Sequence, residues 1–338
     1  MSYIVPQGAR VFHENFTRGV KYLSSSRRYF SLSEPSTNLI RVALMDSNWL
    51  INQLTLADVD EAKGDTVNLG DNSLHTGREV ESRFYKNVAF AGTPFALEEV
   101  DTCCSLTYQQ LSLICNSGSG DDDHINKSMS DYMSKAVALD MLRIGFNGHF
   151  CNYPTNPQKF PKGQDVNIGW HEIAKTTNDG AQIITDKITL GKDGKFPNLD
   201  ALVNYLIMQK IPEEYREDPR LVVLVGAELA GMYRTSLFNG ANSPSDLNAS
   251  QKMLSTVAGR LAIVPPFMPG RRIVVTRLDN LHIYTQTGSR RFRAEFVDDR
   301  SAYEHSYLRN EGYGLGDINL YASIDESAIE IEEGVYSL

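Results

Sequence analysis

The segment Ile125–Ile144, INKSMSDYMSKAVALDMLRI, is the longest part of the sequence with a helical hydrophobic period and no glycine or proline. Most of its apolar side chains are three or four residues apart, which places them on one face of an α-helix. Asp121–Asp123 precede it and suit the positive end of a helix dipole, while Arg143 and then Gly145 suit a helix end. A helix of this length would be about 30 Å long. We therefore expect a scaffold helix with sheets packed against it.

The composition allows a sizeable core but argues against a general nucleic-acid-binding protein. The chain has 338 residues, of which 41% are hydrophobic, enough for one large or two ordinary domains. Its formal net charge is −9 and its pI is about 5.3, which disfavours general binding to phosphates. Residues 1–28 nevertheless carry five basic residues against Glu14 alone, a local charge of +4, so the remainder of the chain carries −13.

Neither membrane insertion nor secretion is expected. The sequence has no apolar run of 18 residues, and its N-terminus, MSYIVPQGARVFHENF, lacks the apolar centre of a signal peptide. We therefore expect a cytoplasm-like compartment. No C-x-x-C pair occurs, and we predict free thiols rather than a structural metal site. The four cysteines are Cys103, Cys104, Cys115 and Cys151.

The N-terminal third predicts two parts that cannot fold alone. Residues 1–48 are basic at first, rich in serine and interrupted by prolines, which is typical of an arm that becomes ordered on a partner surface, with a short helix near 37–50. Strand-like segments at Val59–Gly70 and Phe84–Phe90 flank a turn-rich stretch, which predicts an extended hairpin that projects and packs on something else. Thr107–Cys115 leads into the long helix as a strand or a helix.

The part after the long helix predicts mixed helices and strands. A loop rich in proline and asparagine runs to Gly163, and a short helix follows through Lys175. The next expected elements are a strand at Ile183–Leu190, a helix at Asn198–Lys210 capped by Asn198, a buried strand at Leu221–Val225, a short helix at Glu228–Tyr233, and strands at Ala262–Val264 and Ile273–Thr276. Their order suggests a compact α/β or α+β subdomain over 197–276. Leu281–Thr285 and Tyr321–Ile324 are expected as strands that return to the long helix.

No motif amounts to a catalytic site. His171-Glu172 matches half of the H-E-x-x-H zinc motif, but Lys175 stands where the second histidine is needed, so a surface helix pair is favoured. Gly191–Lys195 lacks the phosphate-loop pattern and has Phe196 where a hydroxyl would hold magnesium, which favours a turn. Asp121–His124 could bind a divalent cation, although a solvated helix N-terminus is favoured. We therefore predict no catalytic, cofactor or metal site.

Five segments carry, in this order, a resemblance to a known family. They are RIGFNG (143–148), GQDVNIGW (163–170), LGKDGKFPNLDALVNYLI (190–207), DPRLVVLVGAEL (218–229) and VTRLDNLHIYTQTGSRR (275–291), with a weaker match at EAKGDTVNLG (61–70). Over about 120–338 the sequence resembles the major capsid proteins of tailed phages in the phage P2 group. No single segment is diagnostic, but their order and spacing are.

The resemblance implies an α+β fold of the Hong Kong 97 capsid type. The implied parts are an N-terminal arm (1–50), an extended β-hairpin loop (51–112), a peripheral domain (113–196) with the spine helix 125–144, an axial domain (197–276), and returning strands of the peripheral domain (277–338). The resemblance also implies a structural protein without catalytic turnover, which assembles into hexamers and pentamers of an icosahedral head around double-stranded DNA.

The same resemblance implies partners and a location. The partners are further copies of the chain, a scaffold, a maturation protease that removes a short N-terminal segment, the portal, packaged DNA and an optional decoration protein. The expected location is the virion shell, assembled in the bacterial host cytoplasm without contact with a membrane.

Two groups of basic residues are candidates for contacts. The first group could meet DNA phosphates on the inner face of the shell or acidic surfaces of neighbouring subunits: Arg10, Arg18, Lys21, Arg27 and Arg28. The second group suits salt bridges between subunits near a symmetry axis: Arg290, Arg291 and Arg293. Lys63, Lys86 and Asn87 lie in the hairpin, but no cross-link can be assigned to them.

Two other functions compete with the capsid interpretation. A cytoplasmic α+β enzyme would bind a small molecule in the segment 197–276, but it has little use for an arm and a hairpin that cannot bury themselves. An encapsulin-type compartment subunit would share the fold, but it has no reason for a basic inner arm. Both features favour a phage shell.

Overall fold

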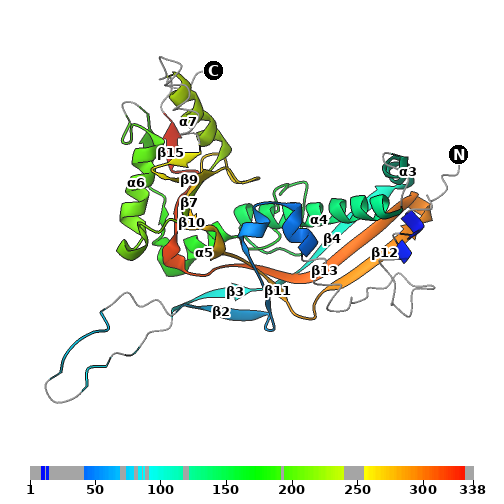
Figure 1. Ribbon diagram of the computed structural model, residues 1–338, viewed down its shortest axis with the longest axis horizontal. Coiled ribbons are helices and arrows are strands. Elements are labelled where there is room, and N and C mark those ends of the chain that lie inside the picture. Colours follow the sequence, from blue (N-terminus) through cyan, green and yellow to red (C-terminus); the bar gives the residue numbers. More distant parts are fainter. Residues whose placement is uncertain are drawn as a thin grey trace.

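The computed structural model has two large β-sheets joined at an angle, with one long helix lying along the sheet of longer strands (Figure 1). The structure describes residues 9–11, 13–14, 42–68, 74–79, 83–85, 87, 91–116, 122–191, 194–239 and 255–331. Helix α4 and the five-stranded sheet form one limb of the molecule, the six-stranded sheet forms the other, and a two-stranded hairpin projects near their junction. This arrangement agrees with the predicted mixture of helices and strands.

Helix α4 (Asp122–Asn147) confirms the predicted scaffold helix and extends it at both ends. Its buried side chains include Ala138, Met141 and Leu142, each at most 2% exposed. The prediction that Gly145 closes the helix is wrong, because the helix continues through it to Asn147. Gly145 is instead a point of close packing, since a Cβ built there would overlap the six-membered ring of Trp170.

The five-stranded sheet is built on β13 (Ala302–Leu315), a long strand that the sequence analysis did not predict. One edge of β13 pairs along ten residues with β4 (Glu98–Thr107), which was also missed. The other edge pairs first with β12 (Arg291–Val297) and then with β11 (Leu281–Gln286), both antiparallel. Strand β1 (Thr55–Val59) adds to β11 in parallel. Since Tyr313 Oη lies 3.1 Å from the Met141 carbonyl oxygen, β13 lies directly against α4.

The six-stranded sheet has the order β5-β14-β10-β7-β9-β8. Its strands are β5 (Ile183–Ile184), β14 (Tyr321–Ile324), β10 (Ile273–Arg277), β7 (Leu221–Val225), β9 (Arg260–Ile263) and β8 (Thr256–Val257). The predicted buried strand β7 is confirmed, and its side chains alternate between the core under α4 and the core under α6. The predicted strand Tyr321–Ile324 is confirmed as β14, which pairs with β10 in this sheet, and its Tyr321 belongs to the same buried cluster as Met141 and Leu142 of α4.

The helices of this limb follow the predicted positions. Helix α6 (Leu199–Lys210) begins at Asn198, whose side chain accepts from the Ala201 amide at 2.8 Å, as predicted for an N-cap. Helix α7 (Ala227–Asn239) is longer than expected. The remaining elements are α3 (Tyr108–Asn116), α5 (Trp170–Thr176), β6 (Ile188–Leu190) and β15 (Ile329–Ile331), with β6 and β15 forming a small parallel pair. The predicted strand Ile183–Leu190 is therefore two short strands in different sheets.

The junction between the limbs is packed around Trp170. Its indole donates to the His282 carbonyl at 2.9 Å and makes edge contacts with Phe146 and Tyr313, with ring centroids 5.1 and 5.5 Å apart. Gly148 lies so close to the Asn167 carbonyl that a Cβ there would overlap it. The end of α4, the start of α5 and strands β11 and β13 are thus held in one close-packed unit.

Buried charged and titratable groups lie between α4 and β13. Arg309 and Glu311 are 1% and 0% exposed, and Arg309 Nε donates to Glu311 Oε2 at 2.6 Å. The Tyr313 hydroxyl donates its hydrogen to Glu311, at 2.8 Å. Further along β13, burial lowers the pKa of His305 to about 4. Replacing one partner of the Arg309–Glu311 pair would leave the other charge buried without compensation, which is strongly destabilising.

Substitution of Gly145 tests the close packing at the junction. An alanine favours a helix interior over glycine by about 1 kcal/mol, but overpacking a rigid core costs about 1–3 kcal/mol or more. Because the Trp170 indole is 1% exposed and held on both sides, we expect Gly145→Ala to lower the free energy of unfolding in urea. Gly231→Ala in α7 is the matched control, since a Cβ there meets no atom within 4 Å. Equal effects of the two substitutions would contradict the packing argument.

The buried His305 predicts a loss of stability in acid. Its pKa is lowered in the folded chain, so the unfolded chain binds more protons between pH about 6.5 and about 4, and stability falls as the pH falls through this window by about 3 kcal/mol. We expect His305→Gln to flatten this part of the pH profile of unfolding. His149→Gln, at a side chain that is 45% exposed, is the control that should leave the profile unchanged. An unaltered profile in His305→Gln would contradict the assignment.

Candidate assembly surfaces

The hairpin is fixed at its base and exposed beyond it. Strands β2 (Lys63–Asn68) and β3 (Ala91–Ala96) pair antiparallel. The Thr66 hydroxyl donates to the Leu315 carbonyl at 3.2 Å, and the ring of Phe95 lies 4.6 Å from that of Tyr284. The base therefore packs on β11 and β13. The predicted hairpin is confirmed, but its second strand is Ala91–Ala96 rather than Phe84–Phe90, where the described residues form no strand.

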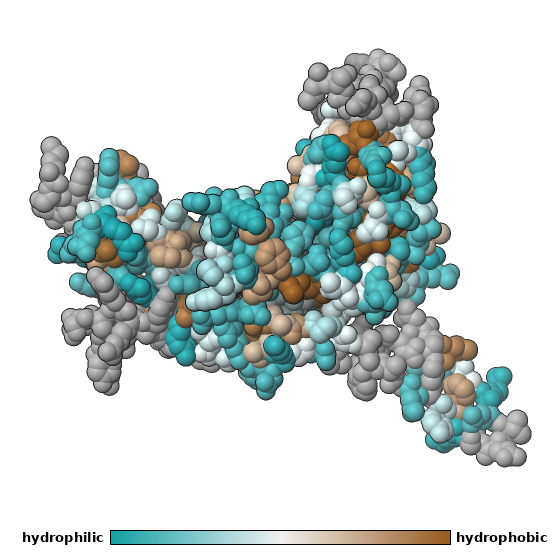
Figure 2. Space-filling model, turned by 180° about the vertical axis from the view of Figure 1, so that it is seen from behind, coloured by the Kyte–Doolittle hydropathy of each residue, from teal (hydrophilic) through white to brown (hydrophobic). Residues whose placement is uncertain are grey.

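Beyond its base the hairpin buries no described side chain. Residues 74–79, 83–85 and 87 are all exposed, and Leu74 and Tyr85 are each 78% exposed. Figure 2 shows this distal part standing apart from the body of the molecule, with hydrophobic residues on its surface. Asn87 is exposed, Lys63 lies at the base, and Lys86 is outside the described residues. These apolar side chains lie far from the core of their own chain, where nothing in the described residues covers them.

The arm is only partly as predicted. Ala9, in a short helical segment, is fully buried, and the ring of His13 lies 5.2 Å from that of Phe296 and 5.8 Å from that of Tyr303. Residues 42–47 are helical, as expected near 37–50, and Leu44 is 5% exposed. The expectation that the whole arm needs a partner surface is therefore wrong for these two segments, which pack on their own chain.

The predicted basic contacts fall into three cases. Arg10 is exposed on the short N-terminal helical segment. The other arm residues of that group lie outside the described residues: Arg18, Lys21, Arg27 and Arg28. The second group bonds within the chain, since Arg290 pairs with Asp58, Arg291 Nη1 donates to the Gly288 carbonyl at 2.6 Å, and Arg293 pairs with Glu295. Their contacts with a second subunit stay a prediction.

His171 is buried, so the prediction of a surface helix pair is wrong. Its Nε2 lies 3.3 Å from Asp325 Oδ2, and its Nδ1 lies 3.3 Å from the Ser323 hydroxyl. Burial lowers the pKa of His171, and the hydrogen bond from His171 lowers the pKa of Asp325. The sequence could not show this pairing, because the two residues are 154 positions apart. Glu172 remains near the surface, where its carboxylate lies 3.2 Å from His149 Nδ1.

The same cluster has the donor types of a metal site, but its charges are already balanced. The ligand atoms of His171, Asp325 and Glu326 lie within 4.8 Å of one another. Lys175 Nζ lies 3.3 Å from Asp325, and Arg272 makes a bidentate pair with Glu326. Two cations thus neutralise the two carboxylates. The cluster acts as an ion-pair network that joins α5 to the end of β14.

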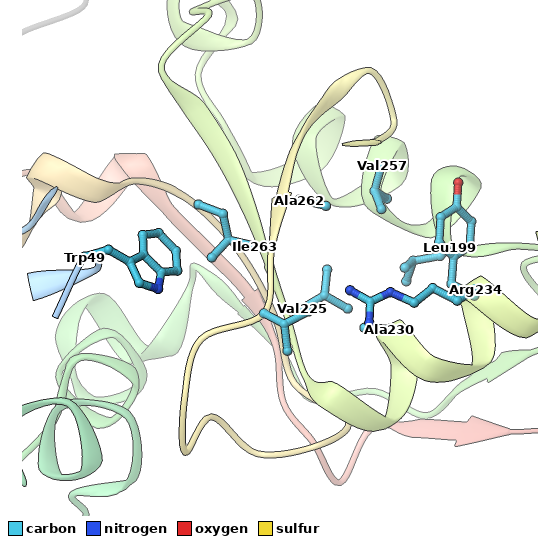
Figure 3. A pocket seen from close by; sticks show the side chains of 10 residues that line it. Trp49, Leu199, Val225, Ala230, Arg234, Val257, Ala262 and Ile263 are labelled. Atoms are coloured by element: carbon cyan, nitrogen blue, oxygen red, sulfur yellow. The ribbon is translucent and has the colours of Figure 1, made fainter. Parts of the chain in front are cut away.

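Two pockets in the described part of the chain differ in their chemistry. One of about 310 Å³ lies beside β9, with Trp49 at one end and Leu199, Val257 and Arg234 at the other (Figure 3). None of the lining residues is a carboxylate, a histidine or a cysteine. The Tyr233 hydroxyl donates to Asp200 at 2.9 Å, and burial raises the pKa of that tyrosine. A second pocket of about 600 Å³ lies under the base of the hairpin, next to Phe95 and Ile168. It is also lined by Glu98 and Cys151, and burial followed by the charge of Glu98 raises the pKa of that thiol, the opposite of what activates a nucleophile.

The chain is similar to known phage proteins along most of its length. A family model described as phage major capsid protein, P2 family, matches residues 14–327. The capsid proteins of Escherichia phage P2 are 24% identical over 276 residues, 76% of each chain. The major capsid protein of Serratia phage KSP20 is 24% identical over 323 residues, 88% of each chain.

Solved structures show the same fold. The chain is similar to one in the satellite phage P4 procapsid that includes the size determination protein, with a TM-score of 0.75 and 20% identity over 97% of this chain and 99% of that chain. The capsid of an empty GTA particle gives a TM-score of 0.50 and 11% identity, over 94% and 98% of the two chains. The expected Hong Kong 97-type fold is confirmed. No helix in the described part of the chain is long and apolar enough to cross a bilayer.

Proposed function

This chain belongs to the P2 family of phage major capsid proteins, and we propose that it builds the shell through the surfaces that a single copy leaves incomplete. It is the major capsid protein of a tailed phage, the structural subunit of an icosahedral shell. The observation that carries the proposal is the distal hairpin, whose exposed Leu74 and Tyr85 gain burial only on another molecule. In the shell, that molecule is a neighbouring copy.

The two limbs support a division of the chain into shell parts. We assign the arm to 1–50, the extended loop to 51–112, the peripheral domain to 113–196 with 277–338, and the axial domain to 197–276. Because β5 and β14 pair within the six-stranded sheet, we add both strands to the axial domain. Hexamers and pentamers then form around the six-stranded sheets, while hairpins reach across to neighbouring peripheral domains.

The basic arm supplies a further contact. Residues 1–28 carry +4 and the remainder of the chain −13, so the arm residues Arg18, Lys21, Arg27 and Arg28 find acidic surfaces on neighbouring copies. Packaged DNA is the other acceptor of the same charge. The scaffold, the maturation protease, the portal and a decoration protein complete the proposed partners, and assembly takes place in the host cytoplasm. The chain itself carries out no catalysis, which agrees with the structural role of its relatives.

Electron microscopy of the expressed full-length chain, alone and with the scaffold of its phage, tests the shell function. We expect closed particles or rings of six and five, because the exposed hairpin is buried only by association. A stable monomer or dimer in both preparations, with residues 51–112 resistant to protease, would contradict the shell function and favour an enzyme with its site in 197–276.

Variants in the same preparation separate the proposed contacts. Leu74→Ser combined with Tyr85→Ser should abolish closed particles while leaving the unfolding temperature of the unassembled chain unchanged, since both side chains are exposed.

Glutamine at Arg18, Lys21, Arg27 and Arg28 should impair the assembly of empty shells. Normal empty shells from this second variant would contradict contacts with neighbouring copies and indicate that these basic residues contact DNA instead.

A further inference from the structure

Two strand pairs form a ribbon that joins the sheets. Strands β10 and β14 pair antiparallel in one sheet, and β11 and β13 pair antiparallel in the other. The chain passes between the sheets through two three-residue 3-10 turns, η4 (Leu278–Asn280) and η6 (Ile318–Leu320). Asn280 ties the two passages, because its Nδ2 donates to the Asp317 carbonyl at 3.0 Å and its Oδ1 accepts from the Asp317 amide at 2.7 Å. A change of angle at this connecting ribbon needs few dihedral changes, but it also repacks the apolar cluster that both sheets share with α4.

Arg272 joins the same two limbs at the opposite end of β10. Its Nη1 donates to the Phe146 carbonyl at 2.6 Å, at the end of α4. Its Nε and Nη2 donate to the two carboxylate oxygens of Glu326 at 2.8 and 2.9 Å. The five residues of β10 (Ile273–Arg277) separate this bridge from the connecting ribbon by about 16 Å. A contact at that distance from the ribbon restricts rotation about it.

The chemistry of the bridge suits a rigid link. The last carbonyls of a helix have no partner within the helix and form the negative end of its dipole, so a guanidinium there is favourable. The planar fork of arginine holds a carboxylate in a fixed orientation, which lysine cannot reproduce. Arg272 is 1% exposed, so water is kept from its guanidinium, whereas the Glu326 side chain is 35% exposed.

Contacts beside the bridge strengthen it. The Asn147 side chain donates to the Phe267 carbonyl at 2.9 Å, and the Arg143 guanidinium lies 4.4 Å from the centre of the Phe267 ring. Both contacts join the end of α4 to the segment that leads into β10. Asp325, just after β14, also contacts His171 and Lys175 of α5, so these two elements are held together.

We propose that Arg272 is a positioning residue for assembly: its bridge from Phe146 to Glu326 fixes the angle between the two sheets, and that angle sets the curvature at which copies of the chain close a shell. This inference rests on the shell function proposed above. Each copy is rotated by a fixed angle relative to its neighbour. These angles add up around the assembly and decide whether it closes and at what diameter. A subunit with a loosened bridge therefore samples several curvatures.

Particle diameter tests this role in a way that stability alone does not. The full-length chain is expressed with the scaffold of its phage, and particles of wild type, Arg272→Lys and Glu326→Gln are sized by electron microscopy. We expect a single size class for wild type, and a second size class or open shells for both variants. Arg271→Gln is the matched control, because the neighbouring Arg271 pairs with Glu228 at the surface, where both side chains are 44% exposed. It should keep the wild-type diameter.

The outcomes separate this inference from the shell function. Variant particles of wild-type diameter, even with a lowered unfolding temperature, would show that the bridge only stabilises the fold and would overturn the proposal. Glu326→Gln decides the matter if Arg272→Lys does not fold, since it keeps the volume and one acceptor of the bridge. Failure of both to fold would also overturn it. Absence of particles from the wild-type chain would contradict both the shell function and this inference.

Discussion

The indole of Trp170 occupies the space that a side chain at residue 145 would need, and the rest of the structure depends on this contact. It brings the end of α4 and the start of α5 together and places both against the carbonyl of His282 and the ring of Tyr313. Because the helix cannot shift along the sheet without losing this fit, the long limb is rigid. The six-stranded sheet is joined to this limb by two short connections and by the bridge of Arg272 between Phe146 and Glu326.

A rigid body with unburied extensions is the physical form of an assembly subunit. The two sheets and α4 bury their apolar side chains within one chain, whereas the distal hairpin exposes its own. Burial of apolar surface is the main driving force of both folding and association. The free energy that a single copy does not gain from its hairpin is therefore available for contacts between copies.

The sequence alone predicted elements whose hydrophobic period is clear and missed those whose inner face is polar. Helix α6 followed from its period and its Asn198 cap, and strand β7 from a continuous apolar run. Helix α4 was predicted from a stretch without glycine or proline, but its end was placed three residues too early. Strand β13 was missed because its inward positions include His305, Arg309 and Glu311, buried polar groups that hide the alternation of a half-buried strand. Such groups become acceptable only through partners from other elements.

Glycine and histidine were misassigned for a related reason. Gly145 was predicted to end the helix, but a glycine is needed there because the Trp170 indole of another helix leaves no room for a Cβ. His171 was predicted at the surface, but it is buried beside Asp325 and Ser323. Contacts between residues far apart in the chain have no local pattern. The resemblance to capsid proteins supplied the arrangement of the parts, while the residues that hold the parts together required the structure.

Native-state hydrogen exchange of the unassembled chain tests the central claim, that the junction belongs to the rigid core of the subunit. The amides of Gly148 and Gly169 donate to the Ile144 and Gly148 carbonyls at 2.7 and 3.1 Å, although both residues lie in loop segments outside the helices and strands. The account predicts that these amides exchange as slowly as those of β13, opening only with global unfolding. Exchange as fast as in the exposed hairpin residues 74–79 would contradict it.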